Sequence, residues 1–169
     1  MRMLTPAMIR AITGQQTKEV FIVLTTFKHA DLPTPLRFSS DPTIRHSLTP
    51  LLYKTISRGL TFFYIPMSIQ LPTETLDSPA SAQLSVSNVG RELINTLRSM
   101  DVGTKPATVD MEIVLGSDPD VVGYSIPTLD MVQADWDADA VNLTLTIESL
   151  DREPFPSGNF DASGFPGLF

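Results

Sequence analysis

The chain contains no cysteine. This absence excludes a disulfide framework, thiolate metal sites and thiol chemistry. Histidine is scarce as well: only His29 and His46 are present, and neither has a second metal-binding side chain at helical spacing. We expect both to be solvent-exposed loop residues. Nucleophile-elbow and phosphate-loop motifs are also missing. The sequence therefore offers no catalytic, cofactor-binding or metal-binding residue, and we expect the protein not to be an enzyme.

Long apolar runs are missing too. The longest, such as residues 20–24, are far too short to cross a bilayer. The first twenty residues have neither the apolar run nor the small-residue cleavage site of a signal peptide. We expect no membrane insertion.

Basic residues are missing from one long stretch. Residues 106–151 carry ten acids and no base, whereas residues 1–60 carry eight bases and three acids, within a net charge of −7. Because a nucleic-acid site needs clustered Lys and Arg, we expect that this protein does not grip DNA. The acids would instead face a basic partner surface or line a passage that must not hold polyanions. We assign this acidic face to Asp110, Glu112, Asp135, Asp137 and Asp139.

Three of these acids, in Asp-Trp-Asp-Ala-Asp, imitate the start of a calcium-binding loop. The match fails further on, because Ala140 stands at the glycine position and Thr146 at the bidentate glutamate position. We interpret the three acids as the wet side of a hairpin whose dry side holds Trp136.

What is present is the composition of a globular domain, with 42% hydrophobic and 18% charged residues. Residues 18–27 are rich in β-branched and aromatic side chains and predict a strand buried on both faces. Residues 60–71 predict a second strand, in which Pro66 implies a bulge or an edge. Alternating patterns predict strands over 82–88, from 107 to 115, and over 129–136 and 141–147, with a turn at 116–120 and a hairpin across 137–140. The prolines of 31–42 indicate an extended or edge segment.

Helical signals are few. Thr5 and Pro6 are typical of an N-cap and first helical position, which predicts a short helix ending before Gly14. Residues 88–100 predict the clearest helix, with Asn88 as N-cap and an apolar stripe. We therefore expect a mainly β fold, an antiparallel barrel or sandwich with one packed helix over about 88–100. The expected organisation is a helical segment (1–16), a β-barrel domain (17–150) and a tail rich in Pro, Gly and Phe (151–169).

The ordered segments resemble a known family. TKEVFIVLTTFKHADLPTPLRFSSD, SRGLTFFYIPMSIQLP, LSVSNVGRELINTLRSM, MEIVLGSDPD, EPFP and the terminal FPGLF follow one another. In this order they are similar to a tailed-phage family, long described as a domain of unknown function and encoded among the tail-tip genes of siphophages and prophages. The likeness runs from about residue 17 to the end, and SVSNVGRELI and FPGLF are its most specific parts.

The resemblance implies a structural virion protein at the distal end of the tail, a baseplate hub or distal-tail ring. It implies assembly in the host bacterial cytoplasm, partners among other tail-tip and tube proteins, and a homo-oligomeric ring (trimer or hexamer) through which DNA passes. It implies no catalytic residue. The alternative function is a virion β-sandwich module that binds a host glycan or receptor, with Trp136, Tyr64 and Tyr124 as stacking surfaces.

The last seventeen residues hold four of the nine phenylalanines, Phe155, Phe160, Phe165 and Phe169. Four exposed Phe would form an aggregation-prone patch, so we expect them to be covered. The tail either folds back over its own domain, or docks at least Phe165 and Phe169 on another subunit or tip protein. Its prolines lower the entropy cost of docking.

Overall fold

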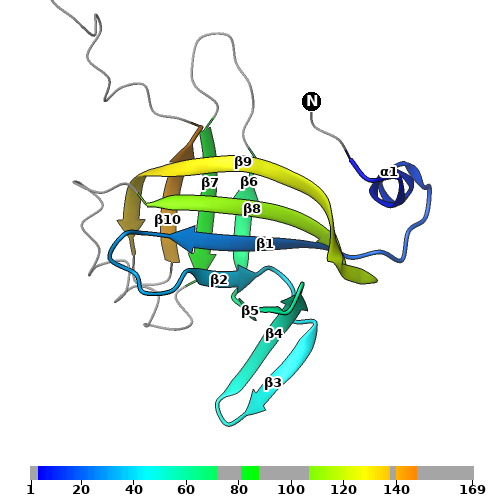
Figure 1. The fold of residues 1–169 in the computed structure, drawn as a ribbon, viewed down its shortest axis with the longest axis horizontal. Helices are drawn as coiled ribbons and strands as arrows, with labels where there is room; N and C mark the ends of the chain where they lie inside the picture. The colour runs from blue at the N-terminus through cyan, green and yellow to red at the C-terminus, as the bar shows by residue number, and fades with distance from the viewer. Residues whose placement is uncertain (1–3, 72–80, 88–106, 138–139, 148–169) are drawn as a thin grey trace, which may run out of the picture.

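The computed structural model describes residues 4–71, 81–87, 107–137 and 140–147. They are mainly β, as the sequence predicts, with one short helix (Figure 1). The elements are α1 (Pro6–Thr13), β1 (Phe21–Lys28), β2 (Leu36–Ser39), β3 (Ile44–Leu48), β4 (Leu51–Ser57), β5 (Leu60–Tyr64), β6 (Met67–Gln70), β7 (Ser81–Ser87), β8 (Thr108–Leu115), β9 (Asp118–Trp136) and β10 (Ala140–Thr146). The predicted helix over 88–100 and the tail over 151–169 lie outside the described residues.

The ten strands of the described residues belong to one sheet, in the order β3-β4-β5-β2-β1-β8-β9-β10-β7-β6. Neighbouring strands are antiparallel except β2 and β5, which pair in parallel through Phe38↔Phe63 and Ser39↔Tyr64. The sheet is therefore mixed. Among the described residues, β3 and β6 are its edge strands.

The sheet bends so that its two halves pack against each other. In Figure 1, β1, β8 and β9 run across the view, whereas β10, β7 and β6 run crosswise to them. The main core lies between these halves and joins Phe27 of β1, Met111 of β8 and Leu143 of β10. The ladder of β9 is irregular, with register shifts against both β8 and β10. Such shifts let one strand turn a corner between crosswise halves of a sheet.

The prediction of a closed barrel or two-sheet sandwich is wrong, because the structure is a single open sheet. The predicted strand over 60–71 divides at Ile65 and Pro66 into β5, which pairs with β2, and β6, which pairs with β7. The dividing residues bridge the gap: Ile65 N donates to Ser39 O at 3.1 Å, and Ser87 N donates to Pro66 O at 3.0 Å. The chain thus passes directly from β5, near one end of the sheet order, to β6 at the other, without a ladder between the two edge strands β3 and β6.

Strand β1 is buried on both faces, as its composition predicts. Phe27 points into the main core. Ile22 and Leu24 point the other way, into a second cluster with Phe62 and Val114. Phe62 of β5 and Val122 of β9 pack against this second, smaller cluster.

The sequence patterns located most strands but missed an extension of the sheet. Residues 43–59 carried no strand prediction, yet they form β3 and β4, which project from the rest of the sheet (Figure 1). The 116–120 turn is tighter than expected, because β9 begins at Asp118 rather than at Leu129. The hairpin of β9 and β10 is confirmed, with Asp137 N donating to Ala140 O at 2.9 Å.

The short N-terminal helix is confirmed as well. Thr5 caps it through its side chain, which accepts from Met8 N, and Pro6 opens it. The helix is held on β9 at a glycine: Thr5 N donates to Gly123 O at 3.2 Å, and a Cβ at Gly123 would lie 2.7 Å from the Met8 methyl carbon. Helix α1 therefore packs where β9 has no side chain.

Candidate functional site

Strand β4 has an inverted distribution of polar and apolar side chains. Its buried face presents hydroxyls, because Thr55 and Ser57 are fully buried. Its other face presents Leu52 and Ile56, each 41% exposed, with Lys54 between them. A strand at a protein surface ordinarily places its apolar side chains inward. The inversion marks the outward face of β4 as the unusual surface of this molecule.

The buried hydroxyls are satisfied by one another and by the backbone. The Thr55 hydroxyl lies 2.9 Å from the Ser39 hydroxyl and 2.8 Å from the Thr43 hydroxyl, and it donates to Asp41 O at 3.2 Å. The Ser57 hydroxyl donates to Pro119 O on β9 at 2.7 Å. These hydrogen bonds join the β3–β4–β5 extension to β2 and β9. Buried polar contacts therefore hold the extension in place where a core would ordinarily use apolar packing.

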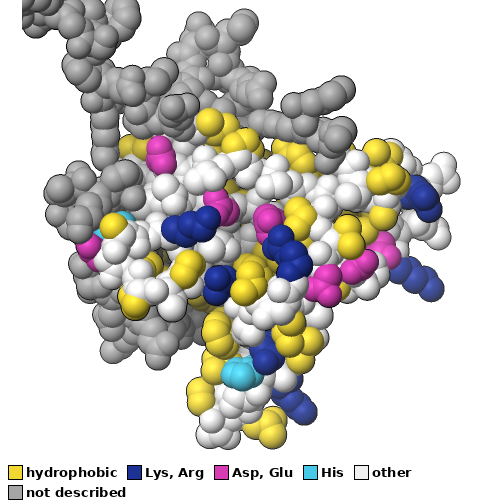
Figure 2. Space-filling view, viewed as in Figure 1, with side chains coloured by type: hydrophobic (Ala, Val, Ile, Leu, Met, Phe, Trp, Pro, Cys, Tyr) yellow, Lys and Arg dark blue, Asp and Glu magenta, His cyan; other side chains and the backbone are white. Residues whose placement is uncertain are grey.

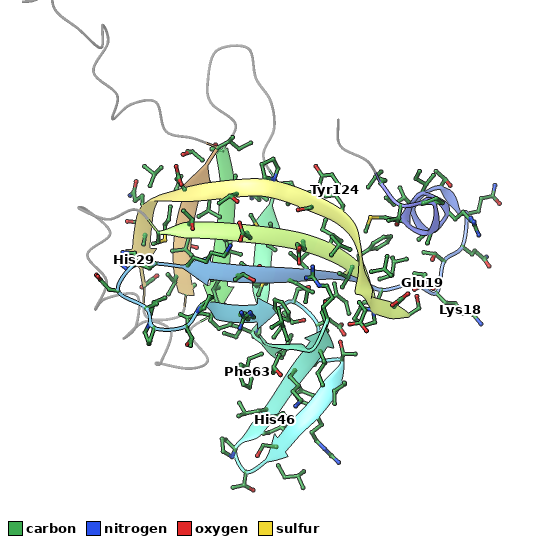
Figure 3. All side chains as sticks on the ribbon, in the orientation of Figure 1. Lys18, Glu19, His29, His46, Phe63 and Tyr124 are labelled. Carbon is green, nitrogen blue, oxygen red and sulfur yellow. The ribbon has the colours of Figure 1, made fainter. Side chains whose placement is uncertain are left out.

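The apolar side chains of the extension form a continuous exposed face. The pairings Ile44↔Lys54 and Lys54↔Phe63 place one residue of each strand in a row, and the ring of His46 contacts the ring of Phe63 at 5.8 Å. Figure 2 shows hydrophobic and basic side chains gathered over this projection, and Figure 3 shows His46 and Phe63 on it. We call this set the hairpin face: Ile44, His46, Leu52, Lys54, Ile56 and Phe63.

The tip of the hairpin is also apolar. Leu48 and Leu51, which pair with each other at the turn, are 70% and 58% exposed. Isolated exposed leucines are ordinary on protein surfaces, but a contiguous group on one projecting element marks an interaction site. The hairpin face and this tip are therefore the strongest candidate functional surface in the described part of the chain. Sequence reasoning missed them because it predicted no strand there.

The acidic residues of β8 do not form a base-free face. Lys28 of β1 forms an ion pair with Asp110 at 2.5 Å, and Thr128 Oγ1 donates to the same carboxylate at 2.7 Å. Arg58 grips Glu112 through two guanidinium nitrogens, with Nη1 3.1 Å from Oε1. The bases that residues 106–151 lack in sequence thus come from the N-terminal third in space (Figure 2).

Arg58 joins the turn between β4 and β5 to the neighbouring strands β8 and β9. Besides holding Glu112, its backbone N donates to the Asp120 carboxylate, at a turn where Arg58 and Gly59 both adopt positive φ. The hydrogen bonds to Glu112 raise the pKa of Arg58 above its ordinary value, against the opposing effect of burial. The turn between β4 and β5 is therefore fastened to β8 and β9, which holds the base of the projecting hairpin.

Asp110 is held in its charged form. Burial raises the pKa of its carboxyl, but the hydrogen bonds from Lys28 and Thr128 and the charge of Lys28 outweigh burial, so this pKa lies below its ordinary value. A carboxyl whose pKa is lower in the folded than in the unfolded state stabilises the fold above the unfolded pKa of about 4. That stabilisation is lost as the pH falls through the folded pKa.

We therefore expect Asp110→Asn to lower the free energy of unfolding by less than about 1 kcal/mol at pH 7, since the pair is partly solvated. The difference between parent and variant should shrink as the pH is lowered below about 4. Urea unfolding at pH 7, 5 and 3 measures it. Asp130→Asn is the control, because Asp130 forms no ion pair with Lys or Arg within the described ranges. A parent–variant difference that stays constant down to pH 3 would contradict the assignment.

The other predicted acids lie elsewhere on the sheet. Asp135 faces outward from β9 opposite Asn142, and accepts hydrogen bonds from Gln133 at 2.9 and 3.1 Å. It borders a depression of about 200 Å³, lined by amide and hydroxyl side chains of β6, β7 and β10 together with Leu84 and Leu143. Asp137 is exposed at the hairpin turn, and Asp139 lies outside the described residues. Within the described residues, no group of three His, Asp or Glu is placed to hold a metal ion.

The two histidines differ from their predicted setting. His29 is buried at 8% exposure rather than solvent-exposed, and its Nδ1 accepts from Asp31 N at 3.2 Å. His46 is exposed, as predicted, but lies on β3 rather than in a loop. Figure 3 places them in different parts of the molecule. The structure does not bring them together.

The aromatic residues considered for glycan stacking are not gathered on one surface. Tyr64 is half-buried and meets Tyr53 edge-on at 6.4 Å. Tyr124 is half-buried and packs against the main core. Trp136 lies in β9, but its side chain is outside the described part. These positions favour packing roles for the two tyrosines.

The predicted interaction residues Phe155, Phe160, Phe165 and Phe169 lie outside the described ranges, so their docking stays a prediction. Among the residues that are described, no helix is long and apolar enough to cross a membrane. No family model matches the chain, and no curated protein matches it.

Proposed function

We propose that this protein is a structural component of the distal end of a siphophage tail, a baseplate hub or distal-tail protein that assembles with other tip proteins. Two lines of reasoning support the proposal. The ordered sequence segments resemble the phage tail-tip family, and the fold carries an exposed apolar surface on a projecting hairpin. The observation that carries an assembly role is the inverted β4, because exposed Leu52 and Ile56 above a layer of buried hydroxyls form an apolar surface that contact with a partner would cover.

In this proposal the subunits form a homo-oligomeric ring, and the hairpin reaches from one subunit to its neighbour. The outward-facing carboxylates Asp130 and Asp135 would suit a surface past which DNA moves, because negative charge repels phosphates. Asp110 and Glu112 contribute less to such a surface, since Lys28 and Arg58 neutralise them. In this proposal the acidic surface past which DNA moves is therefore formed mainly by the carboxylates of β9.

Deletion of the coding sequence from a phage that carries it tests the function. We expect infected cells to accumulate tails without finished tips, visible by electron microscopy, and infectious titre to fall by several orders of magnitude. Supplying the intact chain from a plasmid should restore both. Normal tips on virions of the deleted phage would contradict a structural role, and normal tips with failed adsorption would favour the glycan- or receptor-binding module instead.

A further inference from the structure

The hairpin face needs a partner whose chemistry complements it. It is apolar, through Ile44, Leu52, Ile56 and Phe63, each between 41% and 43% exposed. It also carries a positive charge, because Lys54 stands in its middle. The ligand that fits such a surface is a peptide with large apolar side chains and negative charge.

The chain itself contains such a peptide. Residues 153–169 combine four phenylalanines with two acids, Glu153 and Asp161, and no base. Three prolines, Pro154, Pro156 and Pro166, lack the N–H that a ladder strand donates. This segment would therefore bind through its side chains on a face, rather than add as a strand to the edge of β3.

The place where β10 ends decides which copy of the segment can bind. Figure 1 shows β10 ending on the side of the sheet away from the β3–β4 hairpin. The same chain's segment would have to reverse direction and run back along the sheet to reach the hairpin face. The 22 residues from 148 to 169 can extend at most about 70 Å, which is ample for reaching a neighbouring subunit. A second copy therefore supplies the occupant more directly.

We propose that the hairpin face of one copy binds the C-terminal segment 153–169 of a second copy, with Phe165 and Phe169 packed against Ile56 and Phe63 and the acids of the segment near Lys54. This inference deepens the proposed assembly role by naming its contact, and rests on that proposal. It makes the interface heterologous, since the face and the segment are different surfaces. Such contacts propagate from subunit to subunit and close into a ring when the rotation allows.

The test uses three full-length variants of the purified protein. The face variant is Ile56→Asp, the segment variant is the double change Phe165→Ser and Phe169→Ser, and the control is Val132→Asp, an exposed valine on β9. We expect the parent and the control to self-associate in sedimentation velocity. Both the face variant and the segment variant should self-associate at least about tenfold more weakly. Unchanged circular dichroism and urea midpoints show that each variant is folded.

Mixing separates binding between copies from binding within one copy. The segment variant keeps an intact face, and the face variant keeps an intact segment, so an equimolar mixture should form a one-to-one complex although neither variant associates alone. A fluorescent peptide of residues 153–169 should bind the segment variant, lose at least about tenfold in affinity when Ile56→Asp is added, and bind more weakly at high salt.

Three results would overturn the inference. They are a parent protein that stays monomeric at every concentration, a face variant that associates like the parent, and a mixture of the two variants that forms no complex. All of these measurements use the chain alone. Their failure would remove this contact while leaving the tail-tip role open to the deletion phage, and a failed deletion experiment would leave a measured contact standing.

Discussion

Replacing Phe62 by alanine is expected to lower the free energy of unfolding by about 3–5 kcal/mol, the usual cost of removing a fully buried phenylalanine. Phe62 is 1% exposed and packs with Ile22, Leu24 and Val114 in the second cluster. No other side chain of β5 is buried in that cluster. The loss would be a large share of the stability of a domain of this size.

The adjacent residue provides a matched control. Phe63 is the same residue type on the same strand, but it is 42% exposed on the hairpin face. We expect Phe63→Ala to change the free energy of unfolding by less than about 1 kcal/mol while weakening self-association. Urea unfolding with a shared slope measures the first effect for both variants. Equal losses for Phe62→Ala and Phe63→Ala would contradict the assignment of a buried and an exposed face to β5.

Replacing Thr55 by valine is expected to cost about 1–3 kcal/mol, although valine is the more apolar residue. The substitution keeps the shape of the side chain but removes the hydroxyl that joins Ser39, Thr43 and the carbonyl of Asp41. Because Thr55 and Ser39 are fully buried, water cannot replace the lost partner. The Ser39 hydroxyl still donates to Asp41 O, which limits the loss.

Thr61→Val makes the same chemical change on the opposite face. Thr61 pairs with Ile56 on β4 and is only half-buried, so we expect its variant to unfold within about 0.5 kcal/mol of the parent. Thermal or urea unfolding of the two variants side by side decides the matter. A Thr55→Val protein as stable as the Thr61→Val protein would show that the buried hydroxyls contribute no net stability.

Local patterns predicted the parts of this fold whose side chains follow the ordinary rule. In β7 and β10 apolar residues alternate with polar ones, and the alternation predicts the buried face because that face meets the main core. In β8 the alternation holds at Val109 and Met111, but Val114 on the other face is buried too, in the second cluster. The short helix α1 was found from its capping residues alone. These elements can be predicted from sequence because side-chain alternation and helix capping depend on residues that are close together in the chain.

The projecting hairpin was missed because it breaks that rule. Its buried face is mainly polar and its exposed face mainly apolar, and Lys54 on one face and Tyr53 on the other interrupt the alternation that would indicate a strand. The sequence predicts only part of the division of the 60–71 strand. Pro66 indicates an irregularity, but that β5 pairs with β2 whereas β6 pairs with β7 depends on strands distant in the chain. An open sheet therefore took the place of the expected barrel.

Charge shows the same limit. The charges along residues 106–151, ten acids and no base, predict an acidic face. Ion pairs, however, form between residues that are distant in the sequence. Lys28 and Arg58 reach Asp110 and Glu112 because β1 lies beside β8 and the β4–β5 turn packs on β9. Only the tertiary structure determines which carboxylates form ion pairs with Lys or Arg.

By itself, the sequence determined that this protein is mainly β, that cysteine chemistry is excluded, and that its last residues are rich in phenylalanine. Composition and the spacing of apolar residues are enough for these three conclusions, because each depends only on residue types and their order along the chain. Only the tertiary structure decided that the sheet stays open, that the acids of β8 are neutralised, and that Leu52 and Ile56 face outward. Which face of a strand is buried depends on what packs against it, and that partner is chosen by contacts across the whole chain.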